Sequence, residues 1–121
     1  MLNHMVEQFA HLDAVFHALA DPTRRAMLGQ LAERELSIGE LATPFSMSLA
    51  GASKHVRVLE KAGLVTRTIR GRSHVCRLEA ARLAEANAWL RRYQHFWTAK
   101  LDTLEALLRA EDEAKAKQVK E

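Results

Sequence analysis

The sequence has little of what breaks helices or cross-links chains: its 121 residues include one cysteine, two prolines and five glycines. A single cysteine, Cys76, excludes a disulfide within the chain and favours a reducing compartment, so we expect a cytoplasmic protein. Scarce proline and glycine, together with long stretches of Ala, Leu, Glu and Arg, predict a mainly helical fold.

Long apolar runs are also missing. No stretch approaches the roughly 20 apolar residues that span a bilayer, and the first residues lack the layout of a signal peptide, so we expect no membrane partner. A 48% hydrophobic and 27% charged chain of this length fits one domain with one core. Because it has no glycine-rich phosphate loop, nucleophile elbow or metal triad, we do not expect an enzyme or a cofactor.

Positive charge is concentrated in one block. The net charge is only +3, yet residues 48–78 hold seven Lys and Arg residues and a single acidic residue, Glu60. The rest of the chain therefore has a net negative charge. A basic block in an otherwise acidic protein indicates a phosphate-binding surface, although a merely solvated charged surface has the same composition.

The first half of the chain contains the start and stop signals of four helices. Apolar residues at intervals of three and four predict an amphipathic helix over 5–19, and Asp21-Pro22 predicts the start of a second over 22–33. Ser37 and Glu40 form a capping box for a short helix that ends before Pro44. Ser48 opens a fourth helix over 48–62, which Gly63 ends. Two short helices joined by about four residues are typical of a helix-turn-helix.

The second half changes periodicity. Residues 64–69 and 74–78 are rich in β-branched side chains and flank Arg70-Gly71-Arg72-Ser73, which predicts a hairpin with a four-residue loop. From Ala80 to about Arg109 we expect one long helix. The fold class is therefore mainly α with a small β-hairpin, a winged helix-turn-helix with a long C-terminal dimerisation helix. We expect one domain over 1–110 and a charged, frayed tail over 111–121.

The helix over 48–62 has two different faces. Leu49, Ala52, Val56 and Leu59 share the face expected to pack inward, whereas Lys54 and Arg57 point away from it. Small residues near its start would let the backbone approach base edges in a major groove, and the hairpin arginines would reach a minor groove or its phosphates. The candidate DNA-binding residues are Ser48, Ala50, Gly51, Ser53, Lys54, His55, Arg57, Arg70 and Arg72. Arg67 and Arg77 are expected instead to keep an edge strand soluble.

Three segments together resemble the ArsR family of winged-helix repressors. These are ALADPTRR over 18–25, SMSLAGASKHVRVLEKAGLV over 46–65, and Arg70-Gly71-Arg72 followed by a strand that ends at Leu78. The resemblance covers roughly residues 12–80. It implies a homodimer that represses transcription from an operator, a double-stranded inverted repeat, until an inducer weakens DNA binding.

The metal-site motifs of that family are missing here. The segment over 36–41 has no cysteine, and His95 is followed three residues later by Thr98, not by Glu. No metal ligands are therefore assigned, and the inducer, a small molecule or a metal ion, is unidentified. His4, His11 and His17, or His74 with Cys76, stay open as ligands recruited across a dimer.

Apolar residues recur every seven positions along the last helix, and aromatic residues widen the stripe beyond what one small core needs. This favours a two-fold interface, with the first helix contributing; the aromatic cluster could instead line a small-molecule pocket. The candidate dimer-interface residues are Phe9, Leu12, Leu83, Leu90, Tyr93, Trp97, Leu101 and Leu104. An alternative function is a winged-helix module that binds a protein, which an outward Val58 would favour.

Overall fold

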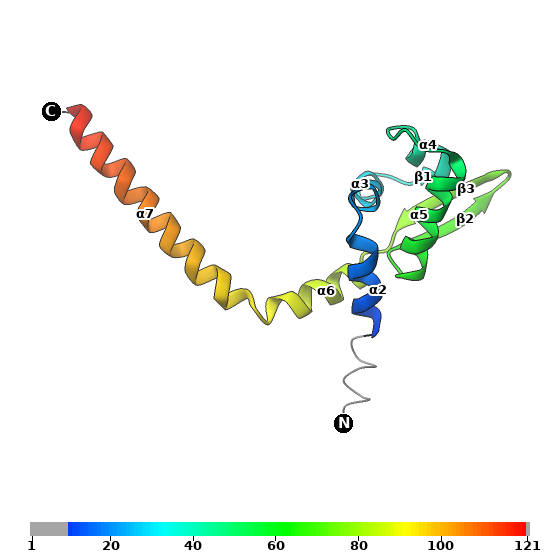
Figure 1. Cartoon of the computed structure of the whole chain (residues 1–121), viewed down its shortest axis with the longest axis horizontal. Coiled ribbons are helices and arrows are strands. Elements are labelled where there is room, and N and C mark those ends of the chain that lie inside the picture. Colours follow the sequence, from blue (N-terminus) through cyan, green and yellow to red (C-terminus); the bar gives the residue numbers. More distant parts are fainter. Residues whose placement is uncertain (1–9, 121) are drawn as a thin grey trace, which may run out of the picture. The chain divides into compact units, whose positions relative to one another are not determined.

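The computed structural model describes residues 10–120, which fall into two units divided between Ala86 and Asn87. In the first unit the order is α2 (Ala10–Leu19), α3 (Pro22–Leu31), β1 (Leu36–Ser37), α4 (Ile38–Ala42), α5 (Leu49–Lys61), β2 (Val65–Arg70) and β3 (Ser73–Leu78). Helix α6 (Ala81–Arg91) follows, and α7 (Gln94–Lys120) lies in the second unit. This order confirms the predicted winged helix-turn-helix (Figure 1).

The helix starts follow local capping chemistry. The Asp21 carboxylate accepts a hydrogen bond from the Arg24 backbone N–H at 2.9 Å, and Pro22 takes the first position of α3. Ser37 and Glu40 form the predicted capping box of α4. Gly63 ends α5 with φ +76°, a conformation that costs glycine little because it has no Cβ.

The core of the first unit lies between the helices and one face of the sheet. Helix α5 packs against α2, α3, α4 and β2. Met27 of α3, Leu41 of α4, and Val56 and Leu59 of α5 are completely buried. Together they fix α5 against the rest of the unit while its opposite face stays exposed.

The sheet has three antiparallel strands in the order β1-β3-β2, one more than the predicted hairpin. Leu36 pairs with Cys76 and Ser37 with Val75, so the two-residue β1 lies on the free edge of β3. The predicted four-residue loop is wrong, because Arg70 pairs with Ser73 and only Gly71 and Arg72 form the turn. Gly71 has φ +62°, as such short turns require.

The single helix predicted after the hairpin is also wrong. The chain leaves the α-helical pattern at Arg92 and Tyr93, where backbone N–H groups bond to carbonyls three residues earlier. The rings of Trp89 and Tyr93 meet edge to face there, with centroids 5.2 Å apart. Helix α7 then runs to Lys120, past the predicted end near Arg109. The division of the chain at residue 110 stays a prediction. No helix within residues 10–120 is long and apolar enough to cross a membrane.

Candidate nucleic-acid interface

Helix α5 is fixed by a cap at its first turn and by the packing of its buried face. The Ser48 hydroxyl caps the helix, accepting a hydrogen bond from the Gly51 N–H at 3.0 Å. Ala52, Val56 and Leu59 are completely buried, as expected. Leu49 was expected on the same face but is 63% exposed, because it stands at the first turn, beyond the elements that cover the later turns.

The outward face of α5 carries the predicted small and basic residues. Ala50, Lys54 and Arg57 are exposed, and Gly51 and Ser53 are half-buried on its edges. Within residues 10–120, Lys54 and Arg57 have no hydrogen bond or ion pair. Their charges are therefore available to an external anion, and the small residues beside them leave room for a close approach.

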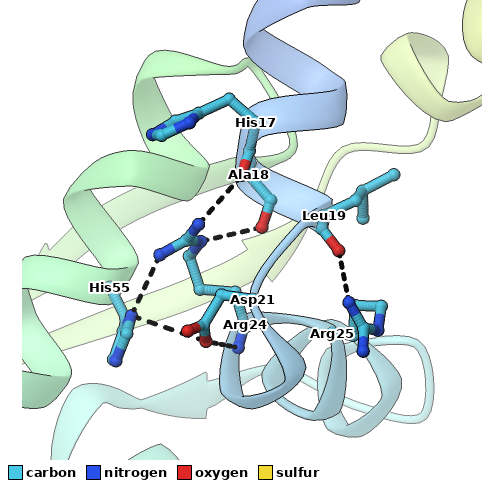
Figure 2. A network of polar contacts seen from close by, with 7 residues as sticks. All are labelled: His17, Ala18, Leu19, Asp21, Arg24, Arg25 and His55. Carbon is cyan, nitrogen blue, oxygen red and sulfur yellow. Dashed lines mark hydrogen bonds and ion pairs between the residues drawn. The ribbon is translucent and has the colours of Figure 1, made fainter.

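His55 differs from Lys54 and Arg57 because its side chain makes polar contacts with other residues of the protein. Its Nδ1 lies 3.4 Å from Nη1 of Arg24 and 4.0 Å from Oδ2 of Asp21 (Figure 2). A hydrogen bond at the shorter contact has Nδ1 accept, because a guanidinium can only donate, whereas an ion pair with Asp21 has a doubly protonated ring; Nε2 carries a proton in both cases. His55 therefore connects α5 to the start of α3 and keeps Nε2 as a donor.

Arg24, to which the sequence analysis gave no role, holds this corner together, although it belongs to the segment that carries the family resemblance. Its Nε donates to the carbonyl of Ala18 at 2.7 Å and its Nη2 to that of His17 at 2.9 Å (Figure 2). The neighbouring Arg25 donates to the carbonyl of Leu19 at 2.7 Å. A pair of arginines after a capping Asp-Pro was the available signal, because the last carbonyls of a helix need donors.

The electrostatics of this corner favour an ionised Asp21. The hydrogen bond from the Arg24 backbone lowers the pKa of the Asp21 carboxyl, and the nearby charges of His55 and Arg24 lower it further. The carboxylate thus caps α3 and faces the imidazole of α5. The corner between α2 and α3 is consequently tied to the basic helix by polar contacts as well as by packing.

The hairpin arginines divide into two pairs. Arg70 precedes the turn, Arg72 lies within it, and both are exposed. Arg70 lies 3.5 Å from a Glu35 carboxylate oxygen, and Arg72 has no polar partner among the described residues. Their contact with DNA stays a prediction. Arg72 is the more available of the two, because its charge is uncompensated.

Arg67 and Arg77 are used within the protein. Arg67 pairs with Glu60 of α5, and Arg77 pairs with Glu79 at 3.0 Å. Hydrogen bonds from Thr66 and Arg77 lower the pKa of Glu79, which keeps this carboxylate charged. The basic block therefore has fewer free cations than its composition indicates, and the free ones lie on the outward face of α5 and at the turn.

The candidate dimer residues differ in their exposure. Phe9 is outside the described residues, Leu12 is buried in the core of its own unit, and Leu83 is half-buried. The others are exposed although they are large and apolar: Leu90, Tyr93, Trp97, Leu101 and Leu104. On α7, Trp97, Leu101, Leu104 and Leu108 are 42–59% exposed at alternating intervals of four and three residues. An apolar stripe with this spacing is typical of a helix that packs against another helix.

The residues left open as metal ligands, and the residue that would favour a protein partner, lie in different settings. Within residues 10–120, no three His, Cys, Asp or Glu side chains come together as metal ligands, and His4 lies outside this range. His74 contacts Arg67, and burial raises the pKa of the buried Cys76 thiol. Val58, the residue that would favour a protein partner, is half-buried.

Known proteins match this chain over the same region. A family model described as a helix-turn-helix domain matches residues 19–68. The chain is 37% identical over 99 residues to the HTH-type transcriptional regulator Rv2034 of Mycobacterium tuberculosis, covering 82% of this chain and 90% of the relative. It is 28% identical over 79 residues to the transcriptional repressor SdpR of Bacillus subtilis, covering 65% of this chain and 88% of SdpR.

Two solved structures extend the likeness to the fold. The ArsR family transcriptional regulator RHA00566 superposes with a TM-score of 0.69 at 39% identity, over 74% of this chain and 92% of its own. Mb0332 of Mycobacterium bovis, described as a homodimeric winged helix-turn-helix DNA-binding domain, superposes with a TM-score of 0.58 at 27% identity. That match covers 77% of this chain and 83% of Mb0332.

Proposed function

This chain belongs to the ArsR family of winged helix-turn-helix transcriptional regulators, and we propose that it is a homodimeric repressor of an inverted-repeat operator. The family consists of transcriptional regulators, not enzymes. The observation that carries the proposal is the division of the basic block: Lys54, Arg57 and Arg72 have no internal partner among the described residues, whereas Arg67 and Arg77 do. Cations left unpaired on one surface are those that can replace the counterions of DNA.

Helix α5 would enter the major groove with its first turns. Ser48, Ala50 and Gly51 let the backbone come close, and Lys54 and Arg57 bind phosphate or guanine. Ser53 and the Nε2 of His55 are the candidates for reading bases, because both are short and lie beside the basic face. Arg70 and Arg72 would contact the adjacent minor groove or its phosphates.

The homodimer would form through the second unit and the first helix. The stripe of Leu90, Tyr93, Trp97, Leu101 and Leu104 supplies an apolar surface that a second copy can cover, and the half-buried Leu83 of α6 is a further candidate. Leu12 of α2 would contribute little surface because it is already buried, and Phe9, the other candidate near it in the sequence, lies outside the described residues. A two-fold axis would place two copies of α5 about one DNA turn, ~34 Å, apart.

Release from the operator would follow binding of an inducer, a small molecule or a metal ion, that favours the free dimer. Such a regulator works where the chromosome is, so we propose a cytoplasmic location. SdpR, a relative of this chain, is a transcriptional repressor, which supports repression over activation.

The test is a footprint on genomic fragments, including the promoter of the protein's own gene, at two salt concentrations. We expect a protected inverted repeat whose affinity falls steeply with salt, by about 10³-fold or more between 50 and 200 mM if about six phosphates are contacted. The absence of a footprint on every fragment would contradict the proposal.

A further inference from the structure

A pocket of about 400 Å³ opens between the start of α4, the first half of α5 and the hairpin. Its lining includes Ser37, Leu49, Ser53, Arg67, Arg72 and His74. All of these residues belong to the first unit, and their elements pack against one another. The volume lies in the range of small-ligand sites.

The side chains of the pocket are rich in donors. No carboxylate is among the lining residues, and Arg72 has no internal counter-charge among residues 10–120. The Ser37 hydroxyl already accepts a hydrogen bond from the Glu40 N–H at 3.1 Å, so its own proton is left to donate. The Nδ1 of His74 lies 3.3 Å from Nη1 of Arg67. When Nδ1 accepts a hydrogen bond from this guanidinium, the ring proton is on Nε2. The pocket therefore offers a positive charge and several N–H and O–H donors.

Arg67 adds an independent observation. Its Nη2 binds Glu60 and its Nη1 contacts His74, but its Nε is buried with no acceptor within the described residues. A buried N–H without a partner is unfavourable, and such atoms in native structures commonly mark an unseen water or ion. The Nε atom of Arg67 is shielded from solvent. The Arg67 guanidinium would therefore have to turn slightly for Nε to reach an acceptor in the pocket.

We propose that this pocket binds one oxyanion group, a phosphate or a carboxylate, with Arg72 supplying the charge and Arg67 the unpaired donor. The group could come from the operator backbone or from a free small molecule whose apolar part lies against Leu49 and Ile38. The first source rests on the proposed function and the second does not. Since Ser53 and Arg72 are also candidate DNA contacts, a free anion seated here would compete with DNA.

The experiment uses the ¹⁵N-labelled full chain without DNA. Inorganic phosphate, dimethyl phosphate and benzoate are titrated at constant ionic strength maintained with chloride, and the Arg67 Nε–Hε resonance and the Ser53 and Ser73 amides are followed by NMR. Two variants are compared, Arg72→Gln in the pocket lining and Arg70→Gln, which flanks the same turn but is not among the lining residues. Both arginines are exposed, so both variants should fold.

We expect saturable shifts with at least one probe, weakened about fivefold or more by Arg72→Gln and less than about twofold by Arg70→Gln. Shifts that stay linear with the concentration of all three probes, or equal weakening by both variants, would overturn the proposal. Either result would mean that the anions are attracted by the general positive charge and do not bind at a defined site.

A second arm separates the two sources. Neutral methylphosphonate substitution at single operator positions should lower the affinity of the natural chain but not of Arg72→Gln if a backbone phosphate occupies the pocket. Competition by benzoate at constant ionic strength identifies a free anion as an occupant. If the chain binds no DNA at all, the proposed function fails while the titration without DNA still decides the pocket.

Discussion

The guanidinium of Arg24 bridges the end of α2 and the imidazole of His55, a residue on the helix proposed to enter DNA. Two of its nitrogens donate to the carbonyls of Ala18 and His17 at 2.7 and 2.9 Å, and the third lies 3.4 Å from His55 Nδ1. One side chain therefore fixes a helix end and sets the orientation of a candidate base-reading ring.

Replacement of Arg24 by Met should destabilise the fold and disturb DNA recognition. Two charge-assisted hydrogen bonds are removed from a partly exposed site, so we expect about 2 kcal/mol and a Tm lower by about 10 °C. Arg25→Met is the matched control, because this exposed neighbour makes one bond to Leu19 and should cost less than about 1 kcal/mol. Equal losses in the two variants, measured by thermal and urea unfolding, would contradict the bridging role.

Acid should weaken the corner at Asp21. Because folding lowers the pKa of Asp21, the ionised carboxylate stabilises the folded state fully above the ordinary carboxyl pKa, and this contribution is lost as the pH falls through the lowered value. Asparagine can keep the cap but not the charge. Asp21→Asn should therefore be less stable than the natural chain at neutral pH.

The same variant should lose less stability than the natural chain between about pH 5 and pH 2, the range in which carboxylates of this kind titrate. Urea unfolding over this range measures the difference. The pKa values of Glu40 and Glu79 are also lowered, so the variant keeps part of its acid sensitivity. Parallel pH profiles for the two proteins would show that the Asp21 charge plays no part.

Removal of the Lys54 charge should weaken binding to every DNA sequence alike. We expect the Kd of Lys54→Ala to rise about fivefold to tenfold at low salt. The slope of log Kd against log salt concentration should fall by about 0.9 for each phosphate that is no longer neutralised, and by twice that in a symmetric dimer. Lys117→Ala removes the same charge from the exposed end of α7 and should change neither quantity. Fluorescence anisotropy at several salt concentrations gives both, and an unchanged salt slope for Lys54→Ala would remove this residue from the interface.

The apolar stripe of α7 should determine the oligomeric state. Leu101→Glu places a charge in the middle of the stripe and should raise the dimer Kd about 100-fold or more, because an unpaired carboxylate would be buried in the interface. Val119→Glu introduces the same charge at a residue that is 86% exposed and off the stripe, and should leave the dimer intact. Sedimentation velocity distinguishes monomer from dimer; a fully dimeric Leu101→Glu chain would place the interface elsewhere.

Two glycine variants should change stability in opposite directions. Gly29 lies within α3 with no atom within 4 Å of the position a Cβ would take, so Gly29→Ala should stabilise by about 0.5–1 kcal/mol. Gly71 has equally open space but φ +62°, so Gly71→Ala should destabilise by about 1 kcal/mol. Urea unfolding of the two variants measures both, and the same sign for both would contradict the assigned turn conformation.

Features that depend on a few neighbouring residues were predictable from the sequence. Asp21, Ser37 and Ser48 cap their helices as expected, and Gly63 ends α5, because each signal acts within one helical turn. The inward face of α5 was predictable in its later turns. The prediction failed only at Leu49, since periodicity identifies a helix face but does not show where the elements that cover this face end.

Features that depend on distant residues were not predictable. Arg24 and His55 are 31 residues apart in the chain, and no periodicity relates them. The pairing of Arg67 with Glu60 removed a cation that composition alone had left free. Two residues of β1 are too few for a recognisable alternation, and the break at Arg92 and Tyr93 contains neither glycine nor proline.

Ser37 has two structural roles: it pairs with Val75 as the last residue of β1, and its hydroxyl caps α4. Ser37 thus joins the sheet to α4 within a single residue. A twist of the hairpin would therefore reach α4 directly, and through the α4–α5 packing it would reach the basic helix. A continuous set of contacts thus connects the hairpin with the proposed recognition helix, so we expect a tilt of the hairpin to reach α5.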